Sequence, residues 1–188
     1  MLFSRIDIPI AFSAIHQEVM ALLNSSWLEH VNRACYQGQW DVLALTAPAH
    51  ARDQHPILQT FAIQHSDAWC KLATLKQCPQ LNHWLDTFQC SLKSIRLMRL
   101  APNSHIKAHC DNGLGWEDGE ARLHLPVETS SEVDFLVQGQ SVPMQSGELW
   151  YINAGEMHEV TNHSQQPRIH LVIDCEINDW LQSHFRVQ

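Results

Sequence analysis

The sequence lacks the basic region that proteins binding nucleic acids or anionic membranes usually carry. Its 188 residues contain 12 lysines and arginines against 20 acidic residues, which gives a formal net charge of −8 at pH 7. No stripe or cluster of basic residues stands out against this acidic background. Nucleic acids and anionic membrane surfaces are therefore disfavoured as partners.

Long apolar runs and paired cysteine motifs are also missing. No stretch approaches the roughly 18 apolar residues that a membrane-spanning helix needs. Arg5, Asp7 and His16 interrupt the first apolar residues, where a signal peptide would have an unbroken apolar core. The six cysteines form no CxxC pair and match no zinc-ribbon spacing. We therefore expect a cytoplasmic protein with reduced thiols and no membrane association.

What the sequence does contain is enough for one domain with a real core. Hydrophobic residues make up 45% of the chain and charged residues 17%, as in ordinary globular proteins. No repeat, low-complexity tract or linker divides it. We predict a single domain over residues 1–188, with a helix-rich flanking and substrate-side region at 1–93 and a β core at 94–175.

The first half has mainly helical patterns. Apolar residues recur at helical spacing over 12–22, and again over 81–88 just after a proline that suits a helix start. Residues 40–45 (WDVLAL) predict a strand, and 47–56 predict a loop. The helices are expected to cover one outer face of the β core.

From residue 94 onward short apolar runs alternate with turn residues such as Asn112-Gly113 and Ser146-Gly147. This spacing is typical of an antiparallel sandwich or barrel. The predicted strands are SIRLMRL from Ser94, RLHLPV from Arg122, VDFLV from Val133, ELWYI from Glu148, MHEVT from Met157 and RIHLVID from Arg168.

Two of these strands place unusual polar residues on one face. Side chains alternate along a strand, so Arg122 shares a face with His124, and Arg168 shares a face with His170 and Asp174. An ordinary sheet with one solvated face remains an alternative. Solvated faces usually carry Lys, Glu, Thr and Ser, however, so Arg and His in two strands favour a polar cavity.

One short motif could bind a metal ion. His109 and Asp111 lie two residues apart in or beside a turn, so both side chains can reach the same ion. His158, in the strand after Asn153-Ala154-Gly155, is a candidate second histidine. Two histidines and one carboxylate leave coordination positions open on iron(II) for a 2-oxo acid and O₂. The HxD motif alone is common, and its two residues often bind no metal.

Arg168 gives the motif more weight. It follows His158 by ten residues and one hairpin turn, on a strand that we expect to lie beside the strand of His158. Its planar guanidinium suits the distal carboxylate of 2-oxoglutarate. The alternative is a surface arginine or one paired with Asp174 or Glu159.

Four segments between Ser94 and Asp174 resemble the aspartyl/asparaginyl β-hydroxylase family of iron(II)- and 2-oxoglutarate-dependent oxygenases. The resemblance covers a little under half of the chain, and the order and spacing of the segments make it specific. They are RLAPNSHIKAHCDN from Arg99, EARLHLPV from Glu120, GELWYINAGEMHEVTN from Gly147 and RIHLVID from Arg168.

This resemblance implies a mainly β fold, a double-stranded β-helix (jelly roll) related to the cupins, with flanking helices. It implies iron(II) at His109, Asp111 and His158, with Arg168 on the distal carboxylate of 2-oxoglutarate and O₂ as the other co-substrate. Arg122 and His124 match a family Arg-x-His pair and are expected near the co-substrate.

The carboxylate position narrows the expected substrate. The animal protein-modifying members of the family lack this ligand, whereas Asp111 keeps it here. The chain therefore looks more like bacterial proline hydroxylase-like relatives. We expect a dioxygenase that hydroxylates a C–H bond of a small amino acid, in preference to an aspartyl or asparaginyl residue of a protein.

The Gly-rich loop after the HxD motif, residues 112–120, is either a lid with Trp116 facing the substrate or a plain solvated connection. Other functions also stay open. One is a cupin-like metal protein, either a dioxygenase or an isomerase, that does not use 2-oxoglutarate. Another is a small-ligand binding module, and a third is a module docked on a protein partner. The sequence does not indicate an oligomeric state.

Overall fold

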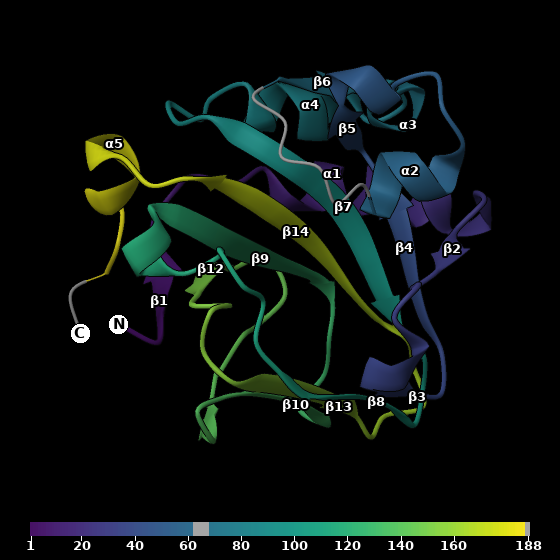
Figure 1. The fold of residues 1–188 in the computed structure, drawn as a ribbon, viewed down its shortest axis with the longest axis vertical. Coiled ribbons are helices and arrows are strands. Elements are labelled where there is room, and N and C mark those ends of the chain that lie inside the picture. Colours follow the sequence, from purple (N-terminus) through teal and green to yellow (C-terminus); the bar gives the residue numbers. More distant parts are fainter. Residues whose placement is uncertain (62–67, 187–188) are drawn as a thin grey trace.

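Two facing β-sheets form the body of the protein in the computed structural model, which describes residues 1–61 and 68–186 (Figure 1). The large sheet has the order β1 (Phe3–Ile6), β12 (Leu149–Ile152), β9 (Glu120–Glu128), β14 (Arg168–Glu176), β7 (Leu92–Leu100), β4 (Trp40–Ala44) and β2 (Leu28–Glu29). The small sheet has the order β11 (Gln140–Ser141), β10 (Val133–Val137), β13 (His158–Asn162), β8 (Ser104–His109) and β3 (Tyr36–Gln37).

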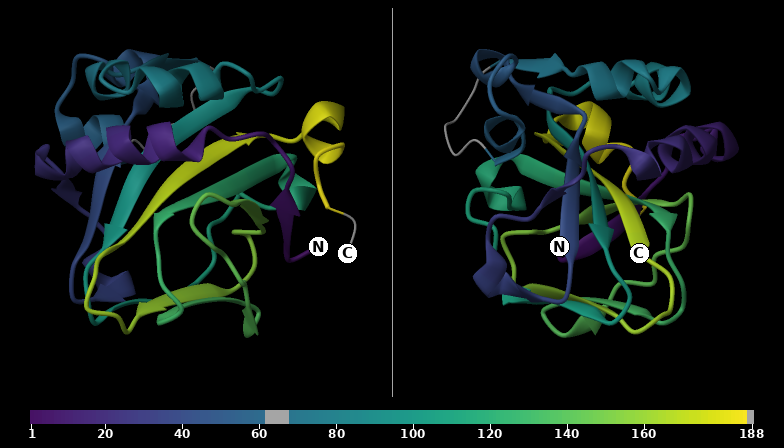
Figure 2. Two further views of the ribbon diagram at one scale, coloured as in Figure 1. Left: turned by 180° about the vertical axis from the view of Figure 1, so that it is seen from behind. Right: turned by 90° about the vertical axis from the view of Figure 1, so that its right-hand side faces the viewer.

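Helices α1 (Phe12–Ala21), α3 (Ala73–Lys76) and α4 (Pro79–Leu85) pack on the outer side of the large sheet, away from the small sheet (Figures 1 and 2). Helix α2 (Pro56–Phe61) lies beside β4, where Phe61 packs against the inner core, and α5 (Asp179–Gln182) lies near the C-terminus. A separate ribbon pairs β5 (Thr46–Pro48) with β6 (Trp69–Lys71). Within the described ranges, none of the helices is long and apolar enough to cross a bilayer.

The predicted jelly-roll architecture is confirmed. Each of the six strands expected after residue 94 is present, as β7, β9, β10, β12, β13 and β14, and the helices expected at 12–22 and 81–88 are α1 and α4. Residues before 94 also supply strands to both sheets, so the β structure extends beyond the predicted core. The loop expected at 47–56 begins with strand β5 instead. Strand β8 was missed because its sequence, SHIKAH, mixes polar and apolar residues without an apolar run.

Alternation along the central strands separates two apolar cores. Leu97, Leu123 and Leu171 point to the outer face of the large sheet and pack with apolar residues of α1 and α4. Met98 and Val172 point to the inner face and pack with residues of the small sheet, such as Phe135. Polar residues of the inner face therefore lie between the two sheets, where they can line a cavity.

The turn between β13 and β14 passes the chain from one sheet to the other. Asn162 is fully buried there, and its amide donates to the backbone carbonyls of Leu100, Ala101 and Gln166 at 2.8 to 3.1 Å. Strand β13 lies between β10 and β8, whereas β14 lies between β9 and β7. The expectation that the strand of Arg168 lies beside the strand of His158 is thus wrong, because the connection crosses between sheets. The two strands lie in the facing sheets instead.

Candidate metal centre

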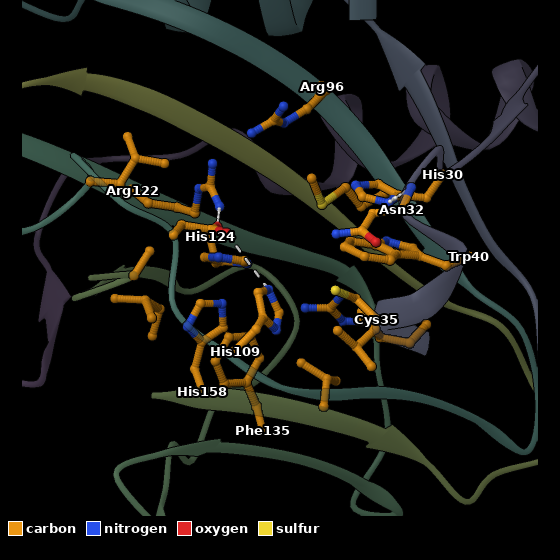
Figure 3. Close-up of a pocket in the computed structure, with 18 of the residues that line it drawn as sticks. His30, Asn32, Cys35, Trp40, Arg96, His109, Arg122, His124, Phe135 and His158 are labelled. Carbon is orange, nitrogen blue, oxygen red and sulfur yellow. Dashed lines mark hydrogen bonds and ion pairs between the residues drawn. The ribbon is translucent and has the colours of Figure 1, made fainter. Parts of the chain in front are cut away.

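The structure brings His109, Asp111 and His158 together beside the cavity between the sheets. Figure 3 shows His109 and His158 side by side. His109 ends β8 and pairs with His158 at the start of β13, and their ring centroids are 4.3 Å apart. Asp111 follows just after β8, where its backbone N–H donates to the carbonyl of Ala154 at 2.8 Å. One donor atom from each of the three side chains lies within 4.8 Å of the other two.

Both histidines present the same nitrogen to this point. His109 Nδ1 donates to the carbonyl of Lys107 at 2.8 Å, and His158 Nδ1 donates to the carbonyl of Glu156 at 2.9 Å. Because a carbonyl only accepts, each Nδ1 carries the proton and each Nε2 keeps its lone pair for a metal ion. Burial also lowers the pKa of His158, which favours the neutral, metal-binding imidazole. The donor set therefore fits a divalent ion such as iron(II).

Asp111 is held by a chain of charged groups that the sequence did not reveal. Arg122 contacts Asp111 through Nη1, and its Nε and Nη2 donate to Asp174 at 2.7 and 3.0 Å. Burial alone would raise the pKa of Asp111, but the charge of Arg122 outweighs it and lowers that pKa. Arg122 thus joins the candidate ligand to a second carboxylate on β14. Its predicted contact with 2-oxoglutarate stays a prediction.

Arg168 lies in the same cavity without such a partner. The residue is 2% exposed, its Nη2 lies 2.7 Å from His170 Nδ1, and its Nε has no hydrogen-bond partner among the described residues. The guanidinium carbon lies 5.7 Å from the centroid of the Phe135 ring. Burial lowers the pKa of Arg168 to about 9. Within residues 1–61 and 68–186 no carboxylate pairs with it, which excludes the predicted alternatives of Asp174 and Glu159 there.

His124 lies between the two arginines. It is 5% exposed, its Nδ1 is 3.3 Å from His170 Nδ1, and its ring meets Phe135 edge-on. Burial, followed by the charges of Arg168 and Arg122, lowers the pKa of His124 well below its ordinary value. The ring is therefore neutral and can exchange hydrogen bonds with a bound ligand.

These groups line one cavity of about 310 Å³ between the sheets. That volume is near the lower end for small-molecule sites, so it suits small ligands. Residues from the first half of the chain close it as well, namely His30, Asn32, Cys35 and Trp40, and Arg96 enters from β7. Sequence reasoning missed these residues. For Arg96 a signal existed, since it occupies an inner-face position of a predicted strand.

Trp116 is placed differently from the other predicted site residues. It begins a short 3-10 turn, Trp116–Asp118, and packs against Tyr151 and Phe185 with ring centroids 5.9 and 5.4 Å away. It is not among the residues that line the cavity, whereas Asn112 and Leu114 from the same loop are. Its role in substrate binding stays a prediction.

Comparisons with known proteins agree with this architecture. The chain is 27% identical over 151 residues to an L-proline cis-4-hydroxylase of Rhizobium meliloti (strain 1021), a match that covers 79% of this chain and 52% of that protein. The chain thus spans about half the length of this curated relative.

Solved structures resemble it in fold. One is an oxidoreductase of the 2OG-Fe(II) oxygenase family from Burkholderia pseudomallei, with a TM-score of 0.58 and 13% identity over 85% of this chain and 77% of that chain. Another is the non-heme alpha ketoglutarate dependent epimerase SnoN from nogalamycin biosynthesis, with a TM-score of 0.53 and 12% identity over 92% of this chain and 76% of that chain. At these identities the likeness shows the fold alone.

A family model supplies the assignment. The model of the aspartyl/asparaginyl beta-hydroxylases matches residues 11–177, which include the metal-binding candidates and every cavity-lining residue named above. The chain belongs to the aspartyl/asparaginyl β-hydroxylase family.

Proposed function

We propose that the protein is an iron(II)- and 2-oxoglutarate-dependent dioxygenase that hydroxylates a C–H bond of a small free amino acid. Family membership and the L-proline cis-4-hydroxylase relative support this reaction class. The observation that carries the proposal is Arg168, a buried guanidinium without a carboxylate partner in the described structure, in the same cavity as a His-Asp-His cluster. A buried, unpaired cation destabilises the fold, and the carboxylate of a bound dicarboxylate would supply the missing counter-charge.

In this proposal His109, Asp111 and His158 hold the metal through two Nε2 atoms and one carboxylate. Three protein ligands leave positions for the 2-oxo acid and O₂. Iron(II), when bound with 2-oxoglutarate, supplies the O₂ activation that turns C–H into C–OH as the co-substrate becomes succinate and CO₂. Arg122 keeps Asp111 ionised and fixes its orientation, with Asp174 holding Arg122 in turn.

The remaining residues position the co-substrate and exclude water. Arg168 binds the 5-carboxylate of 2-oxoglutarate by paired N–H donors, a geometry for which guanidinium is suited. His170, which lies against Arg168, and His124 beside it are both neutral and buried, so in this proposal they flank the bound carboxylate. Phe135, Ile152 and Val160 give the cavity apolar walls, which strengthen these charge contacts by keeping water out.

The test is succinate formation with iron(II), ascorbate and 2-oxoglutarate across a panel of free amino acids, aspartyl peptides and small acids. We expect at least one free amino acid to stimulate succinate formation and to gain one oxygen atom, as read by mass spectrometry. Asp111→Ala should abolish this activity. Asp134→Ala is the matched control, because Asp134 is an exposed carboxylate of β10 that pairs with His163 outside the cavity.

Two outcomes would contradict the proposal. One is product formation by the wild type that does not depend on 2-oxoglutarate, which would favour a cupin-like metal enzyme. The other is the absence of any stimulation across the panel despite metal binding, which would favour a binding module.

A further inference from the structure

Arg96 is a cavity residue that the proposed reaction leaves without a role. It lies on β7 at an inner-face position, with Val172 of β14 opposite on one side and Ala44 of β4 on the other. Both neighbours are small, so neither covers the guanidinium. Figure 3 shows Arg96 and Arg122 on the side of the cavity opposite His158 and Phe135.

The hydrogen bonds of Arg96 are incomplete. Its Nη2 donates to Asp174 Oδ2 at 2.9 Å, but Arg122 already donates to both oxygens of that carboxylate. The Nε of Arg96 is buried and has no partner among the described residues. Its side chain is only 16% exposed, so water cannot readily complete the set. Arg96 therefore shares the carboxylate of Asp174 with Arg122 and keeps donor capacity that the described residues do not use.

The wall beside Arg96 is aromatic and uncharged. His30 stacks on Trp40 with ring centroids 3.7 Å apart and 7° between the planes. His30 Nδ1 accepts from the backbone N–H of Asn32 at 3.3 Å, so the proton sits on Nε2. Burial, then the charge of Arg96, lowers the pKa of His30 to about 4. The stacked rings of His30 and Trp40 therefore give Arg96 no counter-charge. They provide a flat apolar surface and one further N–H donor, His30 Nε2.

Charge balance indicates what is missing. Arg96 and Arg122 together face two carboxylates, Asp174 and Asp111, so this cluster is neutral as it stands. Once the Asp111 carboxylate coordinates a divalent ion, its charge is shared with the metal and the two guanidiniums carry a net positive charge. The proposed site of 2-oxoglutarate places its charges at the metal and at Arg168. One negative group is left unassigned on the Arg96 side.

We infer that Arg96 binds the α-carboxylate of the substrate, whose body lies against the His30–Trp40 pair. This inference rests on the proposed function and deepens it. A residue inside a peptide chain has no free α-carboxylate, so the subsite selects free amino acids over protein residues. Arg96 is then a specificity-determining residue that makes one buried charge-assisted pair with the substrate.

Binding to protein loaded with zinc(II) and 2-oxoglutarate tests the inference without turnover. Isothermal titration with each of the twenty common L-amino acids identifies the tightest binder, and the amide of that amino acid is then compared with it. We expect the amide to bind about 100-fold more weakly than the acid, because it leaves a buried guanidinium unpaired. Arg96→Gln should weaken binding of the acid by a similar factor. Arg96→Lys should recover part of the loss.

Arg99→Gln is the matched control. Arg99 lies on the same strand and pairs with Asp41 at 2.8 Å, but it is not among the cavity-lining residues and stacks over Trp27 instead. Its substitution should leave amino-acid binding within about twofold of the wild type, as expected for a distant site. Binding of 2-oxoglutarate should be unchanged in both arginine variants.

Several results would overturn the inference. They are equal binding of acid and amide, unchanged binding by Arg96→Gln, binding of an aspartyl peptide in place of free amino acids, and no amino-acid binding at all. If Arg96→Gln does not fold, the comparison of amino-acid binding with amide binding to the wild-type protein decides the question. Absence of turnover with Arg96-dependent binding would contradict the proposed function while supporting the carboxylate subsite. Turnover of a free amino acid whose binding does not depend on Arg96 would support the proposed function and contradict the carboxylate subsite.

Discussion

The two ends of the cavity differ in whether their buried arginine has a carboxylate partner. At one end Arg122 is neutralised by the fold itself, through Asp174 and Asp111. At the other end Arg168 has histidine and aromatic neighbours and no carboxylate in the described structure. Removing a charge from water is costly unless a counter-charge replaces the water. The difference therefore separates a positioning arginine, complete in the free protein, from a binding arginine that is completed by its ligand.

Burial shows the same contrast in the pKa values. Burial tends to lower the pKa of Arg122, but Asp174 and Asp111 outweigh this and raise it. No charge among the described residues offsets burial for Arg168, whose pKa falls to about 9. The free protein thus stores at Arg168 an unfavourable free energy that an anionic ligand can relieve.

Removing the carboxylate at the Arg122 end should have the largest effect on stability. Asp174→Asn leaves Arg96 and Arg122 with only Asp111 between them, so we expect a loss of about 3–5 kcal/mol in the free energy of unfolding. Urea denaturation of the metal-free protein measures it. Asp41→Asn, at the Arg99 pair outside the cavity, is the control and should cost less because Arg99 is 25% exposed. Equal losses in the two variants would remove the distinction between the clusters.

The second-largest expected effect is a loss of folding stability at acid pH, caused by the buried histidines near Arg168. Burial first, then nearby positive charge, holds the pKa values of His124 and His170 well below 6.5 in the folded state. Below pH 6.5 the unfolded chain binds protons that the folded chain does not, so stability is lost as the pH falls. The slope for each group approaches about 1.4 kcal/mol per pH unit once the pH is well below 6.5. Unfolding free energies of metal-free protein at pH 7.5, 6.5 and 5.5 give the slope.

A variant tests the source of that slope. His170→Gln removes one of the two groups and should reduce the slope between pH 6.5 and 5.5, whatever its effect on stability at pH 7.5. An unchanged slope would mean that other histidines cause the loss.

Trp116 should give the smallest effect on the site. Its ring is partly buried and packs against Tyr151 and Phe185, so Trp116→Ala should lower stability by less than the loss of about 3–5 kcal/mol that is typical of a buried tryptophan. We expect the KM of the amino-acid substrate to stay within about twofold, because the ring lies outside the cavity lining. A large rise in KM at full stability would instead support the predicted lid role of Trp116.

The sequence carries the parts of this architecture that are local. Alternation within RLHLPV and RIHLVID predicted that Arg122, His124 and Arg168 share the inner faces of their strands, and the structure has them there. Alternation depends only on neighbouring residues, so no knowledge of strand pairing was needed. The HxD spacing is local in the same way.

What stayed hidden depends on pairing between distant segments. Asp174 lies opposite Arg122 only because β14 pairs with β9 in one register, and a shift by one residue would separate them. The strand of Arg168 was predicted to lie beside the strand of His158, but the chain crosses from one sheet to the other after Asn162. His30 lies at the cavity because its ring stacks on Trp40, and the spacing of residues in the sequence does not predict this contact.

Binding of 2-oxoglutarate to zinc(II)-loaded wild type and Arg168→Met tests the central claim most directly. The account predicts about 100-fold weaker binding by the variant, because the 5-carboxylate loses its buried counter-charge. It also predicts that the ligand-free variant is at least as stable as the wild type, since an unpaired buried charge has been removed. Unweakened binding of 2-oxoglutarate by a folded Arg168→Met protein would contradict the claim.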